Sequence, residues 1–68
     1  MMTPTIAGRI VRLMESGVRI ELLAARFGCS VPTVYRWRED VGVPRNVKFR
    51  ETIERALTRL ENENGEKA

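Results

Sequence analysis

The fold is decided by the stretch from Ile20 to Glu39, IELLAARFGCSVPTVYRWRE, which contains two short helical patterns joined by Gly28-Cys29-Ser30. In the first pattern, apolar side chains recur at the i, i+3, i+4 and i+7 spacing of one helix face: Ile20, Leu23, Ala24 and Phe27. Gly28 predicts the end of this helix, because glycine adopts positive φ without a Cβ penalty.

The second pattern starts after the turn. Ser30 is the predicted N-cap, and Pro32 lies in the first turn, where its missing N–H costs nothing. Trp37 shares one face with Val34 and Val41, which favours core packing over a stacking platform for single-stranded nucleic acid. The opposite face carries Pro32, Tyr35, Arg36 and Glu39. Two short helices that cross at a glycine-containing turn form a helix-turn-helix motif.

This stretch resembles the DNA-binding helix-turn-helix of bacterial and phage proteins, including phage-type transcriptional regulators. That family places a small residue, a glycine four residues later and a β-branched residue six further on, as Ala24, Gly28 and Val34 do here. Its apolar positions correspond to Leu23, Phe27, Cys29, Val34 and Trp37. The string SVPTVYRW is similar to resolvases, insertion-sequence transposase DNA-binding subunits and phage small terminase subunits. The resemblance covers residues 6–44 and implies DNA binding.

Four helices are expected, so the predicted fold class is all-α: a trihelical helix-turn-helix core plus a C-terminal amphipathic helix. The predicted helices are Pro4 to Ser16 (with Thr3 as N-cap), Arg19 to Phe27, Val31 to Asp40 and Val47 to Asn62. The apolar stripe of the first helix is Ile6, Ile10, Leu13 and Met14. We divide the chain into a DNA-binding domain (1–44), a C-terminal helix that is a candidate dimerisation element (45–64) and a disordered tail (65–68).

The composition bounds the function. A chain of 68 residues allows one domain with a small core. It has one cysteine, Cys29, and no histidine, so neither a disulfide framework nor zinc-ligand spacing is expected. Cys29 is best read as a small buried hydrophobe, with a redox switch as the alternative. Without a histidine base or a glycine-rich phosphate loop, we expect no enzyme, no metal and no cofactor.

The distribution of charge favours a nucleic-acid partner. Residues 1–50 hold nine Lys or Arg against four Asp or Glu, a net +5, whereas residues 51–68 hold three against five, a net −2. Arginine supplies ten of the twelve basic residues, and its fork fits phosphate and guanine. No apolar run reaches the ~20 residues of a membrane span, and the start lacks a signal-peptide pattern. We therefore expect a cytoplasmic, nucleoid-associated protein that binds double-stranded DNA.

The resemblance implies which side chains meet DNA, because the second helix of this motif enters the major groove. The implied base-contacting residues are Val31, Pro32, Tyr35 and Arg36. Arg36 is the strongest of these, since a guanidinium spans O6 and N7 of guanine. The implied backbone-contacting residues are Ser30, Thr33, Arg38, Arg45 and Lys48. For Arg45 and Lys48, a solvated linker accounts for the charges equally well.

The last helix carries a heptad-like apolar seam of Phe49, Ile53, Ala56, Leu57 and Leu60. This seam either packs back on its own domain or pairs with the same helix of a second subunit. We predict a homodimer through this helix, because the motif commonly reads two half-sites.

Two roles fit a chain of this kind. The leading one is a small transcriptional regulator of a phage or mobile element. The alternative is an accessory DNA-binding subunit in recombination, transposition or phage DNA packaging, which would also bind a recombinase, a transposase or a packaging motor. A third reading, a protein-interaction module without DNA binding, predicts no salt-sensitive affinity for duplex.

Overall fold

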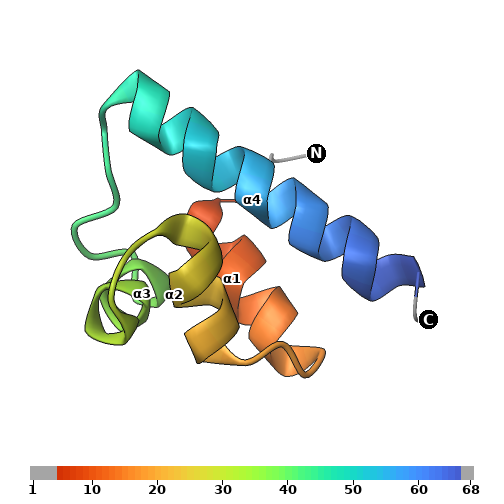
Figure 1. Cartoon of the computed structure of the whole chain (residues 1–68). Coiled ribbons are helices and arrows are strands. Elements are labelled where there is room, and N and C mark those ends of the chain that lie inside the picture. Colours follow the sequence, from red (N-terminus) through yellow and green to blue (C-terminus); the bar gives the residue numbers. More distant parts are fainter. Residues whose placement is uncertain (1–4, 67–68) are drawn as a thin grey trace.

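The computed structural model describes residues 5–66, and within that range the chain forms four helices and no strand (Figure 1). The helices are α1 (Ile6–Glu15), α2 (Ile20–Phe27), α3 (Val31–Arg38) and α4 (Val47–Glu66). α3 packs against α1 and α2, and the long α4 packs against α1 and α2 as well. The structure confirms the predicted all-α class, with a trihelical unit followed by a C-terminal helix.

The first three helices end in the same way. In each, one backbone N–H donates to the carbonyl oxygen five residues earlier, and the N–H of the preceding residue donates to the carbonyl oxygen three residues earlier. This is the Schellman pattern. The residue at the turn has positive φ in all three: Gly17 (107°), Gly28 (73°) and Asp40 (61°). The stop predicted at Gly28 is confirmed. α3 ends two residues before the predicted Asp40, because Asp40 itself adopts the left-handed conformation that closes the helix.

The N-termini of α1 and α4 are capped by polar side chains. The Thr5 hydroxyl accepts a hydrogen bond from the Gly8 N–H at 3.0 Å, so α1 begins at Ile6. The predicted cap, Thr3, and Pro4 lie outside the described residues. Asn46 Oδ1 accepts from the Phe49 N–H at 3.1 Å and fixes the start of α4.

The C-terminal helix is longer than predicted. α4 continues past Asn62 to Glu66, so residues 65 and 66 of the predicted tail are helical. Residues 67 and 68 lie outside the described part of the chain.

One apolar core joins all four helices. Its buried side chains are Ile6, Ile10, Leu13, Ile20, Leu23, Ala24, Phe27, Val34, Trp37, Ile53, Leu57 and Leu60. Trp37 packs between two rings, with its centroid 5.9 Å from that of Phe27 and 5.9 Å from that of Phe49. This confirms Trp37 as a core residue. Val41, expected on the same face, is 55% exposed instead, because the chain leaves the helix before reaching it.

The seam of α4 packs on its own chain. Ile53, Leu57 and Leu60 are almost completely buried, at 0%, 0% and 2% exposure. Ala56 is half-buried against the same core, while Phe49 remains 41% exposed. Of the two arrangements considered from the sequence, this is the intramolecular one. A dimer built on the three buried side chains would require α4 to leave this core, so dimerisation stays a prediction and its interface must be sought elsewhere.

Candidate nucleic-acid interface

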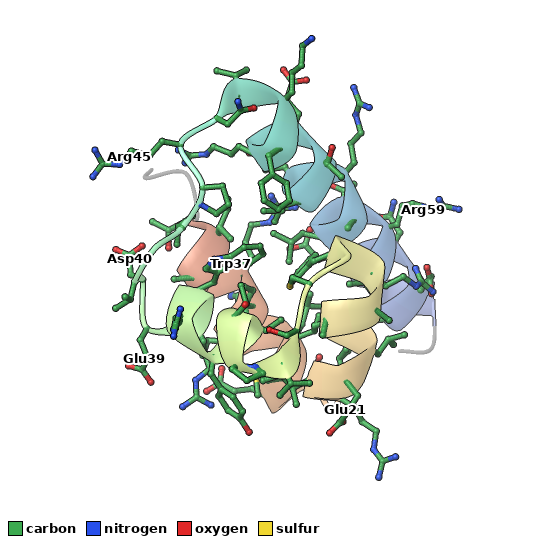
Figure 2. The ribbon with its side chains drawn as sticks, turned by 60° about the vertical axis from the view of Figure 1, so that its left-hand side comes forward. Glu21, Trp37, Glu39, Asp40, Arg45 and Arg59 are labelled. Carbon is green, nitrogen blue, oxygen red and sulfur yellow. The ribbon has the colours of Figure 1, made fainter. Side chains whose placement is uncertain are left out.

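α3 has one buried and one exposed face, as the 3.6-residue period of its sequence requires. Val34 and Trp37 point into the core, and Figure 2 shows the Trp37 ring among the helices. Pro32, Tyr35 and Arg36 are exposed, which agrees with their predicted position on the outward face. Val31 differs from them, because it is half-buried and packs against the core. Only part of the Val31 side chain is therefore available to a base.

The beginning of α3 offers hydroxyl groups at the positive end of the helix dipole. Ser30 occupies the predicted N-cap position, but its side chain makes no capping bond to a backbone N–H. Its hydroxyl instead lies 2.9 Å from the hydroxyl of Thr33. Both side chains therefore sit at a helix N-terminus, which favours an anion such as phosphate.

Two acidic residues follow the end of α3. Glu39 and Asp40 follow the last helical turn, are both exposed, and project outward in Figure 2. These carboxylates would repel a phosphate backbone, whereas no acidic residue lies in the first turn of the helix. Arg36 and Arg38 lie in the last turn of α3, so the acidic residues that follow disfavour the segment after the helix, rather than the helix itself, as the part that meets DNA.

The two arginines of α3 have different surroundings. Arg36 is exposed and forms no ion pair or side-chain hydrogen bond with any residue of the range 5–66. The guanidinium carbon of Arg38 lies 5.6 Å from the centroid of the Tyr35 ring. Arg38 Nη2 also lies 3.4 Å from Glu39 Oε1. Arg36 is thus free to bind a base or a phosphate, while Arg38 already has two partners.

Arg45 and Lys48 are both exposed, and Arg45 lies beside the end of α3 rather than its beginning. Arg45 lines a hollow together with Asp40 and Arg50, and it projects on the same side as Glu39 and Asp40 (Figure 2). The structure therefore does not group Arg45 with Ser30 and Thr33. The contacts of Arg45 and Lys48 with a DNA backbone remain predictions.

Arg19 is a candidate that the sequence analysis did not single out. It occupies the N-cap position of α2, is exposed, and has no ion pair within the described residues. The first helix of a helix-turn-helix crosses the DNA backbone, which brings its N-terminus near phosphate. A basic residue at the boundary before the first helical pattern was the available signal.

Other arginines are committed to holding α4. Arg9 forms two hydrogen bonds with the carboxylate of Glu61, at 2.7 and 2.9 Å, and one with the hydroxyl of Thr58 at 3.1 Å. Arg26 forms two with Glu63, at 2.8 and 3.0 Å. The hydrogen bond from Arg9 lowers the pKa of Glu61 below its ordinary value, and the same contact raises the pKa of Arg9. These charges join α1 and α2 to α4 and are not available to DNA.

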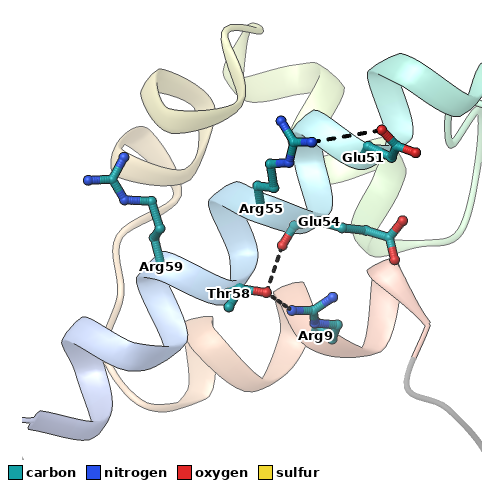
Figure 3. A pocket seen from close by; sticks show the side chains of 6 residues that line it. All are labelled: Arg9, Glu51, Glu54, Arg55, Thr58 and Arg59. Atoms are coloured by element: carbon teal, nitrogen blue, oxygen red, sulfur yellow. Dashed lines mark hydrogen bonds and ion pairs between the residues drawn. The ribbon is translucent and has the colours of Figure 1, made fainter.

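The hollow between α1 and α4 does not extend the interface. It is lined by Arg9, Glu51, Glu54, Arg55, Thr58 and Arg59, and the dashed lines of Figure 3 show that several of these side chains bind one another. Thr58, for example, accepts from Arg9 and donates to the backbone carbonyl of Glu54 at 3.0 Å. Its mixed charge and its position on α4 separate this hollow from the exposed face of α3.

Cys29 lies in the turn between α2 and α3, half-buried against the core. Burial raises the pKa of its thiol, which keeps it protonated and poorly reactive. This agrees with a small packing residue. In the part of the chain that the structure describes, no group of three or more Cys, Asp or Glu residues is arranged to hold a metal ion. No helix in that part is long and apolar enough to cross a membrane.

The comparison with known families matches this geometry. A family model described as a helix-turn-helix domain matches residues 8–41, which contain most of α1 and all of α2 and α3. No match was found among curated proteins or among solved structures.

Proposed function

Because this chain belongs to the helix-turn-helix domain family, whose members bind DNA, we propose that it is a sequence-specific double-stranded DNA-binding protein acting as a small transcriptional regulator. In this proposal α3 enters the major groove and α2 crosses the backbone. The protein acts where the DNA lies, in the cytoplasm, and it occupies an operator without catalysing a reaction.

The separation of the two faces of α3 carries the proposal. Its inner face supplies Val34 and Trp37 to the core, so the outward face is held rigidly without contributing to that core. On the outward face, Arg36, which forms no ion pair within residues 5–66, stands beside the exposed Tyr35. A bidentate contact from arginine to guanine is the commonest specific contact in the major groove. Arg36 is therefore the proposed base reader.

The charges at the two ends of α3 support one orientation. Ser30 and Thr33 at its beginning favour phosphate, whereas Glu39 and Asp40 at its end disfavour it. Arg19, at the start of α2, would bind backbone on the adjacent strand. Together these residues would fix the register in which Arg36 meets a base.

The proposal includes two copies bound to a two-fold site, with fewer side chains of α4 available for the dimer contact than the sequence suggested. The seam of Ile53, Leu57 and Leu60 is used within one chain. Val47 and Phe49, at 68% and 41% exposure, are the apolar side chains of α4 that remain open to a second copy. Val47→Lys would then lower the stoichiometry on the site while leaving the fold intact.

The experiment that tests the proposal is binding to duplex from the upstream region of its own gene and to random duplex, at two salt concentrations, with the complexes sized. Tight, site-selective binding is expected. If binding is weak, strongly salt-dependent and without preference, specificity lies elsewhere, and an accessory subunit of recombination, transposition or packaging becomes the better assignment. If no duplex is bound at low salt, the DNA-binding function itself is wrong.

A further inference from the structure

Tyr35 and Arg38 form a contact on the outward side of α3. They are three residues apart, which places them on neighbouring turns of one helix face. The guanidinium carbon lies 5.6 Å from the ring centroid, within the ~6 Å range of a cation–π interaction. Glu39 Oε1 lies 3.4 Å from Nη2 of the same guanidinium. The side chain of Arg38 is therefore constrained by a ring and a carboxylate.

This contact changes the role expected for Arg38. A phosphate contact needs a guanidinium that can reach the DNA backbone, and that of Arg36 is held by no partner in the described range 5–66. Arg38 would have to give up Tyr35 and move its charge away from Glu39 to do the same. Tyr35, in turn, is 46% exposed and stacks on no other aromatic ring within residues 5–66, so its contact with Arg38 is what restricts the ring.

We propose that Arg38 is a positioning residue, which holds the Tyr35 ring in one orientation for base reading and does not itself bind phosphate. The inference rests on the proposed function and deepens it by assigning how Tyr35 is presented. An exposed aromatic side chain loses rotational freedom when it binds, and a side chain that is already held loses less. Arg38 thus favours the one base pair that fits the orientation in which Tyr35 is held.

The first test needs no DNA. Tyr35 is the only tyrosine of the chain, so its ring resonances are unambiguous in an NMR spectrum. Arg38→Ala should shift those resonances and abolish the ring-to-guanidinium contacts, whereas Arg55→Ala, a control at an exposed arginine of α4, should leave them unchanged. Identical Tyr35 resonances in Arg38→Ala and the unsubstituted protein would overturn the inference.

The second test is a double-mutant cycle on DNA, with Arg38→Ala, Tyr35→Leu and the pair. Affinity is measured on the preferred site and on a site changed at the base pair whose preference Tyr35→Leu alters. Arg38→Ala should lower the preference between these sites about two- to five-fold, the range of an exposed cation–π contact. In the Tyr35→Leu background it should have no further effect. The salt dependence of binding should stay the same.

A phosphate-binding Arg38 would behave differently. In that case Arg38→Ala would weaken binding equally on both sites, and its effect would add to that of Tyr35→Leu. The slope of log affinity against log salt would also fall in magnitude by about 0.9. That result would overturn the positioning role and leave the proposed function standing. If the unsubstituted protein binds no duplex, the proposed function falls, and the base-reading part of the inference falls with it.

Discussion

On α3, Arg36 projects from the exposed face without an ion-pair partner in residues 5–66, whereas Arg9 and Arg26, which face α4, are each held by one of its glutamates. The same residue type thus serves two purposes on two sides of the molecule. Carboxylates of α4 pair with Arg9 and Arg26 and so hold α4 against the other helices. The first two turns of α3 carry no carboxylate, so the charge of Arg36 remains available to a ligand. The presence or absence of a nearby glutamate, rather than the net charge, therefore distinguishes the arginines that pack on α4 from the arginine on the exposed face of α3.

The largest effect should follow from removing a core side chain of α4. Leu57 is completely buried, so Leu57→Ala should lower the free energy of unfolding by about 2–5 kcal/mol, through lost burial and the cavity that remains. Urea denaturation followed by circular dichroism measures this. Arg55→Ala is the matched control, because the Arg55 side chain is 81% exposed and its loss should change stability by less than about 0.5 kcal/mol. Equal effects of both substitutions would mean that α4 does not complete the core.

Arg36→Ala tests the role of the exposed face of α3 in DNA binding. This change should weaken binding to the preferred site by about 1–3 kcal/mol and relax the preference at one base pair, with stability unchanged. Titration on the preferred site and on its single base-pair variants, together with a thermal melt, measures both quantities. A uniform loss on specific and random duplex would show that Arg36 binds phosphate rather than a base.

The pH dependence of stability tests the ion pair between Arg9 and Glu61. The pKa of Glu61 is lowered in the folded protein by Arg9, so its stabilising contribution is present above the unfolded-state pKa and is lost as the pH falls through the folded-state value. Because the Glu61 side chain is 40% exposed, the contribution is about 0.2–1 kcal/mol. Glu61→Gln should therefore reduce the difference in unfolding free energy between pH 7 and pH 3. An unchanged difference would show that the pair contributes nothing in solution.

The smallest effect is expected at the turn after α3. Asp40 adopts φ 61°, where a side chain is disfavoured and glycine is not. Asp40→Gly should raise stability by a few tenths of a kcal/mol, and removing the carboxylate should also tighten DNA binding at low salt. Asp40→Asn separates these effects, since asparagine tolerates the conformation and only the charge changes. If Asp40→Asn leaves the affinity unchanged at low salt, Asp40 lies away from the DNA.

The local sequence predicted the trihelical unit well, because its signals act over a few residues. Gly28 stops α2, Ala24 is buried as a close approach requires, and Trp37 enters the core. The errors are at helix ends with competing signals. Thr5 caps α1 two residues after the predicted Thr3, and Asp40 closes α3 by adopting positive φ although it carries a side chain.

The packing of α4 and the partners within the site were beyond the sequence pattern. The heptad spacing from Phe49 to Leu60 is the same whether the helix packs on its own chain or on another. The pair of Arg9 and Glu61, 52 positions apart, and the contact of Arg38 with Tyr35 depend on side-chain positions that spacing alone does not give. Arg38 was accordingly predicted to be a backbone contact.

The distance along the chain between Arg9 and Glu61 also bears on the order in which the molecule assembles. The turns after α1 and α2 close small loops, whereas contact of α4 with α1 closes one of about 50 residues and costs more chain entropy. We therefore expect α1, α2 and α3 to meet before α4 docks. Leu57→Ala should then accelerate unfolding far more than it slows folding, so α4 would govern how long the folded state persists rather than how fast it is reached.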